Sequence, residues 1–223
     1  YGKKFYSAGR HEWGGKMQDD LTWGVKDLVA KGIADPKRVA IYGGSYGGYA
    51  ALAGLAFTPD LYAAGASFVG PSNLFTLLNS IPPYWESVRR QFDYFVGDPQ
   101  NEEDVARLKA QSPLFSVERM KAPLLVVQGA NDPRVKKAES DQIVEAYRKK
   151  GQAVEYLLAA DEGHGFARPD NRMAAMLALE RFLHRHVGSA LQKDAPVWLE
   201  TKLKVLQQAP TSSPQKSSTN ASR

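Results

Sequence analysis

The chain has 223 residues, 43% hydrophobic and 24% charged, which is the composition of an ordinary globular domain large enough to bury a core. Its formal charge of +5 does not indicate nucleic-acid binding, because the basic residues are scattered and form no stripe interleaved with aromatics. No apolar run has the length of a membrane-spanning helix. The absence of cysteine excludes disulfides and thiol catalysis, and it leaves the compartment open between cytoplasm and periplasm.

Short apolar segments alternate with segments of helical periodicity along most of the chain. The pattern predicts helices at 17–31, 47–57, 137–150 and 171–186, and strands at 38–42, 62–69, 123–128 and 153–159. We expect residues 1–16 to be irregular and residues 71–115 to hold turns with two short helices. From about residue 210 the chain is rich in serine, lysine and proline, and we expect disorder there.

The predicted strands are continuously apolar and are separated by helices, which indicates a parallel sheet covered on both faces. The fold class is therefore α/β. We expect the four strands to be neighbours in sequential order, joined by right-handed crossovers. The chemistry should then lie at the carboxyl ends of the strands.

The segment Gly43-Gly44-Ser45-Tyr46-Gly47 matches G-x-S-x-G, the pattern of a nucleophilic serine on a sharp turn. The motif alone is a weak signal, but here it follows a predicted strand and opens a predicted helix, as such a turn requires. We expect glycine at 43 and 47 to remove collisions at the turn. The N–H of Tyr46, at the helix N-terminus, would stabilise an oxyanion. A plain glycine-rich turn is the alternative.

A nucleophilic serine needs a general base, and the chain has four histidines. His11 lies in the irregular start of the chain, and His184 and His186 lie near the end of the last predicted helix. These last two are two residues apart, so they face different directions and form no metal-binding pair. His164 alone follows a predicted strand, in a loop with flanking glycines. We therefore predict that His164 is the base.

The third member of a triad should be a carboxylate after the preceding strand, and Asp132 fits this position. The alternatives are Asp98, Asp161 and Glu162, which we expect to be solvated loop acids. The order serine, aspartate, histidine, each after its own strand, is that of the α/β-hydrolase fold and not of the chymotrypsin or subtilisin folds. The sequence therefore predicts an α/β-hydrolase with Asp132 orienting the base.

Several segments resemble the prolyl oligopeptidase family of serine peptidases, from residue 1 to about residue 188. They are Trp13-Gly14-Gly15, Ala34-Asp35-Pro36-x-Arg38-Val39-Ala40-Ile41, Gly44-Ser45-Tyr46-Gly47-Gly48-Tyr49, Asp132-Pro133-Arg134-Val135 and Glu162-Gly163-His164-Gly165-Phe166. The acylaminoacyl-peptidase and dipeptidyl-peptidase-like branch is the most similar. The resemblance implies hydrolysis of short peptides by a catalytic domain that follows an N-terminal β-propeller, which restricts substrate size.

The resemblance also implies substrate-binding residues. Arg134 corresponds to an arginine that binds a backbone carbonyl of the substrate, with an ordinary exposed loop arginine as the alternative. An apolar pocket for the residue before the scissile bond is expected to use Val135, Val69, Leu74, Trp85 and Tyr46. Plain packing of these apolar residues is the alternative.

One departure from the family pattern concerns the start of the chain. The family's Tyr-Arg-Gly-Ser segment, whose tyrosine supplies a second oxyanion donor, would precede Tyr1-Gly2. We therefore expect the chain to come from a longer protein, with 1–188 as an incomplete catalytic domain and 189–223 as a C-terminal extension. Expressed alone, the chain is expected to be a poor catalyst, because the second oxyanion donor would be missing. It is also expected to aggregate, because strand 38–42 would present an unpaired edge.

Taken together, these features predict a serine peptidase that acts on short peptides through an acyl-enzyme formed on Ser45. We expect no metal, no organic cofactor and no nucleic-acid partner. A carboxylesterase with the same triad is the nearest alternative, and a truncated or inactive hydrolase domain that only binds a partner is a third. The residue preference, exopeptidase or endopeptidase action and the oligomeric state, a homo-oligomer included, stay open.

Overall fold

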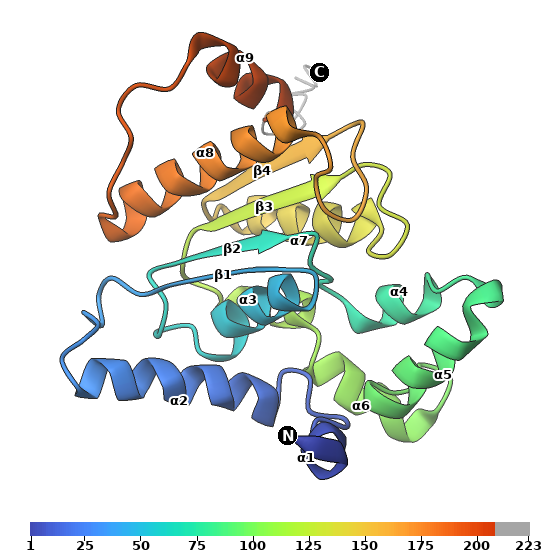
Figure 1. Ribbon diagram of the computed structural model, residues 1–223. Helices are drawn as coiled ribbons and strands as arrows, with labels where there is room; N and C mark the ends of the chain where they lie inside the picture. The colour runs from blue at the N-terminus through green and yellow to red at the C-terminus, as the bar shows by residue number, and fades with distance from the viewer. Residues whose placement is uncertain (208–223) are drawn as a thin grey trace, which may run out of the picture.

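The computed structural model describes residues 1–207, whose strands form one four-stranded sheet. The strands are β1 (Ala40–Gly44), β2 (Ala64–Phe68), β3 (Leu124–Gly129) and β4 (Val154–Ala159). All neighbours pair in parallel, in the order β1-β2-β3-β4 (Figure 1). The predicted parallel sheet in sequential order is thus confirmed, and each strand lies within two residues of its predicted bounds at either end.

Helices follow the strands in the order that the sequence predicts. They are α1 (Gly2–Ala8), α2 (Lys16–Ala30), α3 (Tyr46–Phe57), α4 (Leu74–Asn79), α5 (Glu86–Phe95), α6 (Glu102–Ala110), α7 (Lys137–Lys150), α8 (Pro169–Val187) and α9 (Val197–Leu206), with 3₁₀ helices η1 (Pro83–Trp85) and η2 (Pro113–Arg119). The four predicted helices correspond to α2, α3, α7 and α8, with ends that differ by two residues at most.

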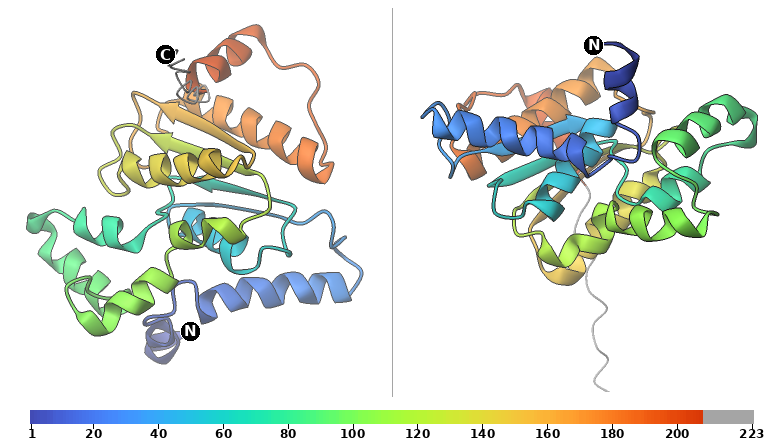
Figure 2. Two further views of the ribbon diagram at one scale, coloured as in Figure 1. Left: turned by 180° about the vertical axis from the view of Figure 1, so that it is seen from behind. Right: turned by 90° about the horizontal axis from the view of Figure 1, so that it is seen from below.

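Both faces of the sheet are covered by helices, which explains the uninterrupted apolar strands (Figures 1 and 2). Along β3, Leu124 and Val126 belong to the cluster that packs on α3 and α7, whereas Leu125 and Val127 belong to the cluster that packs on α8 and α9. Successive side chains of a strand point to opposite faces, so a strand buried on both faces needs apolar residues at every position.

Residues 71–115 are more helical than expected and form a lobe beside the carboxyl ends of the strands (Figure 1). Asn73 caps α4 by accepting a hydrogen bond from the Phe75 N–H (3.0 Å), and Asn101 caps α6 by accepting one from the Glu103 N–H (3.1 Å). Helices this short are only marginally stable in isolation, so their caps and the packing of the lobe stabilise them.

Two helices near the chain ends were not predicted. Within the segment expected to be irregular, α1 forms, and it buries none of its residues. Its Tyr6 ring lies 4.6 Å from that of Phe95, an edge contact that no sequence pattern reveals. Within 189–223, α9 buries Leu199 and Leu203 against the α8 side of the core. The expected disorder from about residue 210 lies outside the described residues.

The first strand, β1, forms one edge of the described sheet, as expected. Tyr42 of this strand is 53% exposed, and α2 presents Leu21 and Leu28 to solvent while it buries Gln18 and Thr22. Among residues 1–207, no helix combines the length and apolar character needed to cross a membrane.

Candidate active site

Ser45 lies at the turn between β1 and α3 in a backbone conformation that L-residues rarely adopt, with φ 57° and ψ −118°. Its N–H donates to the Phe68 carbonyl on β2 (2.9 Å), and its carbonyl accepts from the Tyr49 N–H of α3 (3.0 Å). A non-glycine residue at positive φ costs free energy, so the flanking strand and helix must hold it. The result is a serine hydroxyl presented at the carboxyl end of the sheet.

Close backbone approach at this turn explains two glycines, but not the pair expected. A Cβ on Gly43 would overlap the backbone of Gly47, and a Cβ on Gly48 would lie 2.7 Å from the Cα of Gly70. A Cβ on Gly47 would meet nothing within 4 Å. The expectation that position 47 needs glycine is therefore wrong. The backbone of residue 47 is crowded by position 43, but the space that a side chain at 47 would occupy is open.

Three side chains meet at the carboxyl ends of β1, β3 and β4. His164 Nε2 lies 2.9 Å from Ser45 Oγ, and His164 Nδ1 lies 2.8 Å from Asp132 Oδ2. Both distances are those of hydrogen bonds. The expected proximity of the three is therefore present, with Asp132 fully buried and the imidazole largely shielded from solvent. A hydroxyl, a base and a buried acid in this sequence can generate a nucleophile.

Asp132 is held as a charged acceptor by its own loop. Its Oδ1 accepts the backbone N–H groups of Arg134 (2.8 Å) and Val135 (2.9 Å). Burial by itself would raise the pKa of Asp132, but the hydrogen bonds from His164, Val135 and Arg134 outweigh burial and hold the pKa below its ordinary value. An ionised Asp132 can stabilise the imidazolium that forms when the histidine takes a proton.

A buried glutamine supports this loop and was missed by the sequence analysis. Gln128 Nε2 donates to the Val135 carbonyl (3.1 Å) and lies 3.4 Å from Asp132 Oδ2, while its Oε1 accepts from Ser140 Oγ (2.8 Å). The available signal was a polar residue near the end of a strand that is otherwise apolar, because buried polar groups require partners.

Glu162 is not the solvated loop acid that we expected. It is 3% exposed and accepts hydrogen bonds from the N–H groups of Ala167 (2.8 Å) and Arg168 (2.9 Å) and from Asn171 Nδ2 (2.8 Å). These bonds close the loop that carries His164 onto the start of α8. Glu162 is buried because otherwise unpartnered backbone N–H groups at a helix start need an acceptor.

The two other acids that were weighed against Asp132 are partly exposed, as expected. Asp98 forms an ion pair with Arg89 (3.2 Å), and Asp161 forms one with Arg168 (2.8 Å). Neither carboxylate is bonded to His164. Among residues 1–207, no group of three or more histidine and acidic side chains is arranged to hold a metal ion.

Tyr46 is the first residue of α3, so helix geometry provides its N–H with no partner inside the helix. This N–H follows the Ser45 turn directly, at the positive end of the helix dipole. Its phenol ring packs edge-on against Trp13, with centroids 4.8 Å apart. Burial, assisted by the charge of Asp20, raises the pKa of the Tyr46 phenol to about 12, so the phenol stays neutral at physiological pH.

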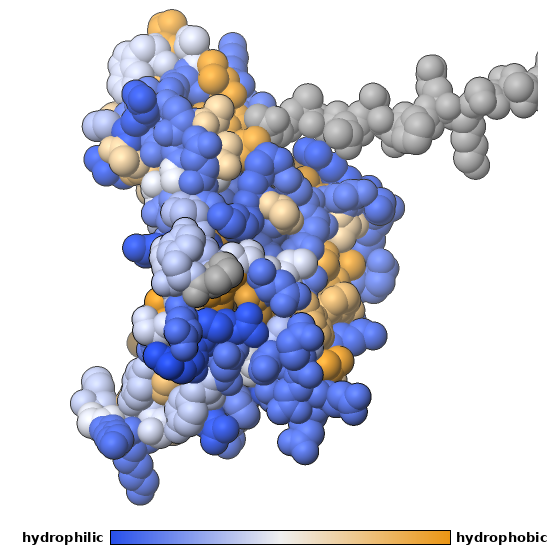
Figure 3. Space-filling model, turned by 90° about the vertical axis from the view of Figure 1, so that its right-hand side faces the viewer, coloured by the Kyte–Doolittle hydropathy of each residue, from blue (hydrophilic) through white to orange (hydrophobic). Residues whose placement is uncertain are grey.

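A cavity of about 510 Å³ opens beside Ser45 and His164. It is lined by Trp13, Ser45, Tyr46, Pro71, Leu77, Ile81, Tyr84, Trp85, Ser87, Val88, Phe92, Arg134, Val135 and His164. The carboxyl ends of the strands point toward the face seen in Figure 3, where apolar surface shows near the middle among polar side chains. A site of this kind suits an apolar group bound next to the serine.

Three of the five residues expected in an apolar substrate pocket line this cavity: Tyr46, Trp85 and Val135. Arg134, which was expected to bind a substrate carbonyl, lines it as well. Val69 and Leu74 do not. Val69 directly follows β2 and is buried, and its N–H donates to the Val127 carbonyl of β3 (2.8 Å). Leu74 packs in the core of the lobe. The wall residues of α4, η1 and α5 were missed apart from Trp85, since residues 71–115 gave no clear secondary-structure pattern.

Arg134 is exposed at the cavity rim, and no other group among the described residues pairs with its guanidinium. An unpaired guanidinium is a ready donor for a carbonyl or carboxylate oxygen.

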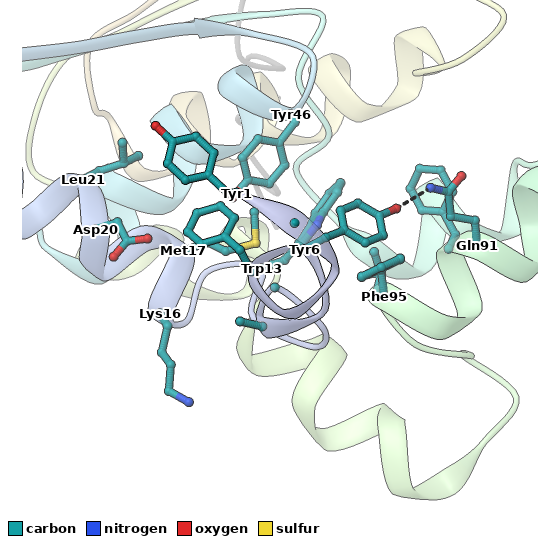
Figure 4. A pocket seen from close by; sticks show the side chains of 16 residues that line it. Tyr1, Tyr6, Trp13, Lys16, Met17, Asp20, Leu21, Tyr46, Gln91 and Phe95 are labelled. Carbon is teal, nitrogen blue, oxygen red and sulfur yellow. Dashed lines mark hydrogen bonds between the residues drawn. The ribbon is translucent and has the colours of Figure 1, made fainter.

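A second hollow of about 990 Å³ lies on the other side of Trp13, Tyr46 and Phe92, which line both cavities. Figure 4 shows the rings of Tyr1, Tyr6 and Tyr46 gathered around it, together with Met17. Gln91 Nε2 donates to the Tyr6 hydroxyl (2.9 Å) across one side. The cavity next to Ser45 thus has an aromatic wall that separates it from a larger apolar hollow.

Comparison with known proteins identifies relatives among peptidases. Residues 1–190 match the sequence model of the prolyl oligopeptidase family. The chain is 52% identical over 188 residues to dipeptidyl aminopeptidase BIII of Pseudoxanthomonas mexicana, an alignment that covers 84% of the chain and 27% of that protein. It is 47% identical over 197 residues to dipeptidyl peptidase family member 6 of Caenorhabditis elegans, covering 88% of the chain and 27% of that protein.

Solved structures show the same similarity in three dimensions. A puromycin-hydrolysing peptidase of Mycobacterium tuberculosis superposes with a TM-score of 0.77 at 29% identity, over 86% of this chain and 28% of that one. The chain therefore spans little more than a quarter of the length of the relatives that it matches.

Proposed function

Because this chain belongs to the prolyl oligopeptidase family, we propose that the protein is a serine peptidase that cleaves short peptides through an acyl-enzyme. The observation that carries this proposal is the pair of hydrogen bonds that joins Ser45 to His164 (2.9 Å) and His164 to Asp132 (2.8 Å). The names of two relatives, at 52% and 47% identity, support substrates from which a dipeptide is released.

The proposed reaction begins at Ser45. Its Oγ attacks the carbonyl carbon of the scissile bond while His164 Nε2 accepts the hydroxyl proton. The carbon–nitrogen bond then breaks, the proton passes from His164 to the leaving amine, and an ester to Ser45 remains. Water attacks this ester, again giving a proton to His164, and the acid product leaves as Ser45 regains its proton. Throughout, Asp132 stabilises the charged imidazole.

Stabilisation of the tetrahedral intermediate is assigned to the backbone N–H of Tyr46. The support is its position as the first residue of α3, immediately after the nucleophile. We further propose that the unpaired Arg134 binds a substrate carbonyl and that Val135, Trp85 and the Tyr46 ring contact the side chain before the scissile bond. Val69 and Leu74 have no part in this assignment.

We also propose a domain organisation for the protein. Residues 1–188 would form the larger part of an α/β-hydrolase catalytic domain, and 189–223 a C-terminal extension whose α9 packs on α8. The relatives are more than three times the length of this chain, which leaves room for the N-terminal β-propeller that the family resemblance implies. A homo-oligomer is compatible with this organisation, and no feature of the surface of residues 1–207 favours a particular oligomeric state.

The test compares amide and ester hydrolysis by the full-length protein. A dipeptidyl 4-nitroanilide and the matched 4-nitrophenyl ester are assayed with the wild type, with Ser45→Ala and with Ser80→Ala, a control that removes a hydroxyl outside the triad. We expect turnover of both substrates by the wild type and by Ser80→Ala, and none by Ser45→Ala. Turnover of the ester alone would favour a carboxylesterase, and turnover of neither by a folded wild type would favour a domain that only binds a partner.

A further inference from the structure

A buried carboxylate outside the triad connects two walls of the cavity next to Ser45. Glu139 lies in the first turn of α7, four residues after Val135, and its side chain reaches the residues that precede α4. The residue is 2% exposed. Burying a carboxylate is costly unless donors satisfy its oxygens, so the partners of Glu139 must be identified.

The partners of Glu139 all belong to the start of the lobe or to its own helix. Its Oε2 accepts hydrogen bonds from the N–H groups of Ser72 (2.9 Å) and Asn73 (3.0 Å) and from Gln142 Nε2 (2.9 Å). Its Oε1 accepts a short hydrogen bond from the Thr76 hydroxyl. Two of these donors are the backbone N–H groups that immediately follow Pro71, a cavity-lining residue, and precede α4.

The hydrogen bonds of Glu139 join two segments that each contribute residues to the cavity lining. On one side, Pro71 and Leu77 line it from the segment that Glu139 holds. On the other side, Arg134 and Val135 line it from the loop that leads into α7, the helix that carries Glu139. The Glu139 side chain thus links the lobe wall to the loop wall. Gln142 of the same helix adds a second link, because its Nε2 donates to Ser72 Oγ (2.9 Å).

The next residue on the same turn acts on a different part of the site. Ser140 Oγ donates to Gln128 Oε1 (2.8 Å), and Gln128 supports the loop of Asp132. Glu139 thus faces the cavity wall, whereas Ser140 faces the support of the triad. This separation provides a matched comparison between two neighbouring buried polar residues.

We propose that Glu139 is a positioning residue that sets substrate affinity by fixing the lobe wall of the cavity, without taking part in the chemistry at Ser45. This inference rests on the proposed peptidase function, because it assigns the cavity to the substrate. Removal of the carboxylate would leave the N–H groups of Ser72 and Asn73 buried without an acceptor, and the start of α4 would move to find one.

The experiment measures kcat and KM of the full-length protein on a dipeptidyl 4-nitroanilide, and the rate at which a small fluorophosphonate labels Ser45. For Glu139→Ala we expect KM to rise about tenfold or more, with kcat and the labelling rate within about threefold of the wild type. Glu139→Gln keeps an acceptor oxygen and should restore KM to within about threefold. Ser140→Ala should instead lower kcat and the labelling rate with little change in KM.

Two results would overturn the inference: an unchanged KM in a folded Glu139→Ala variant, or equal losses in KM, kcat and labelling. Should Glu139→Ala fail to fold, Thr76→Val removes one donor to the same carboxylate and is expected to raise KM by a smaller factor, about two- to fivefold. An unchanged KM in Thr76→Val would then count against the proposal. The same constants measured on the matched ester keep this outcome separate from a failure of the peptidase proposal, which would appear as a wild type inactive on the amide.

Discussion

Asp132 Oδ2 lies 2.8 Å from His164 Nδ1, while the other oxygen of the same carboxylate accepts two backbone N–H groups of its own loop. Every group bonded to this carboxylate is therefore a donor. Such a pocket selects an ionised acid over an amide of the same shape, and this selection leads to the first prediction.

Asp132→Asn should keep the fold and lose most of the activity. The asparagine oxygen would satisfy the N–H groups of Arg134 and Val135, so its NH₂ would face His164 Nδ1 and force the proton onto Nε2, opposite the Ser45 hydroxyl. A histidine in this tautomer cannot accept the serine proton, and the loss for such a change is on the order of 10³–10⁴-fold in kcat. The measurement is kcat of the full-length variant beside its thermal midpoint. Activity within tenfold of the wild type would contradict the assigned role of Asp132.

Two glycines of the turn provide a matched pair of substitutions. Gly43→Ala should disrupt the Ser45 turn, because its Cβ would overlap the backbone of Gly47. Gly47→Ala should be tolerated, since its Cβ would meet nothing within 4 Å and alanine favours the helix that begins there. We expect loss of soluble protein or of fluorophosphonate labelling for Gly43→Ala only. Equal behaviour of the two variants would contradict the turn geometry described above.

The carboxyl group of Glu139 predicts a pH dependence of stability. Burial raises the pKa of Glu139 above its ordinary value of 4.5, and the hydrogen bonds from Thr76, Asn73 and Ser72 oppose this only in part. The folded state therefore binds the proton more tightly than the unfolded state does. The contribution of Glu139 to the free energy of unfolding is then highest below pH 4.5 and falls as pH rises from 4.5 toward the raised pKa.

Glu139→Gln lacks this proton and should lack this part of the pH dependence. Between pH 4.5 and pH 8, the thermal midpoint of the wild type is expected to fall relative to that of the variant. A difference between the two midpoints that stays constant over this range would show that the pKa of Glu139 is not raised.

The parallel sheet and the triad geometry could be predicted because each depends on local signals. A strand buried on both faces must be apolar throughout, and a functional residue after such a strand must lie at its carboxyl end, so Ser45, Asp132 and His164 were found together. The pocket could not be predicted in the same way. Leu74 and Leu77 are the same residue type and lie on the same short helix, yet only Leu77 lines the cavity. Which of the two faces the cavity depends on how α4 is rotated about its axis, and packing in the folded chain determines that rotation.

The buried acids show a second limit of the sequence. Glu162 and Glu139 were indistinguishable from solvated acids, since each is buried by partners that come together only in the folded chain. Glu139, for example, accepts from Ser72 and Asn73, more than sixty residues earlier in the chain. Neither hydrophobic periodicity nor a local sequence motif can predict such a long-range contact.

The central claim, that Ser45 is a nucleophile activated by His164, is tested most directly by covalent labelling. The full-length protein is treated with a fluorophosphonate, digested, and the modified residue is identified by mass spectrometry, with Ser45→Ala and His164→Ala treated in parallel. The arrangement described here predicts a single labelled site at Ser45, no labelling of Ser45→Ala, and labelling of His164→Ala slowed by several orders of magnitude. Labelling at another residue, or undiminished labelling of the Ser45→Ala variant, would contradict it.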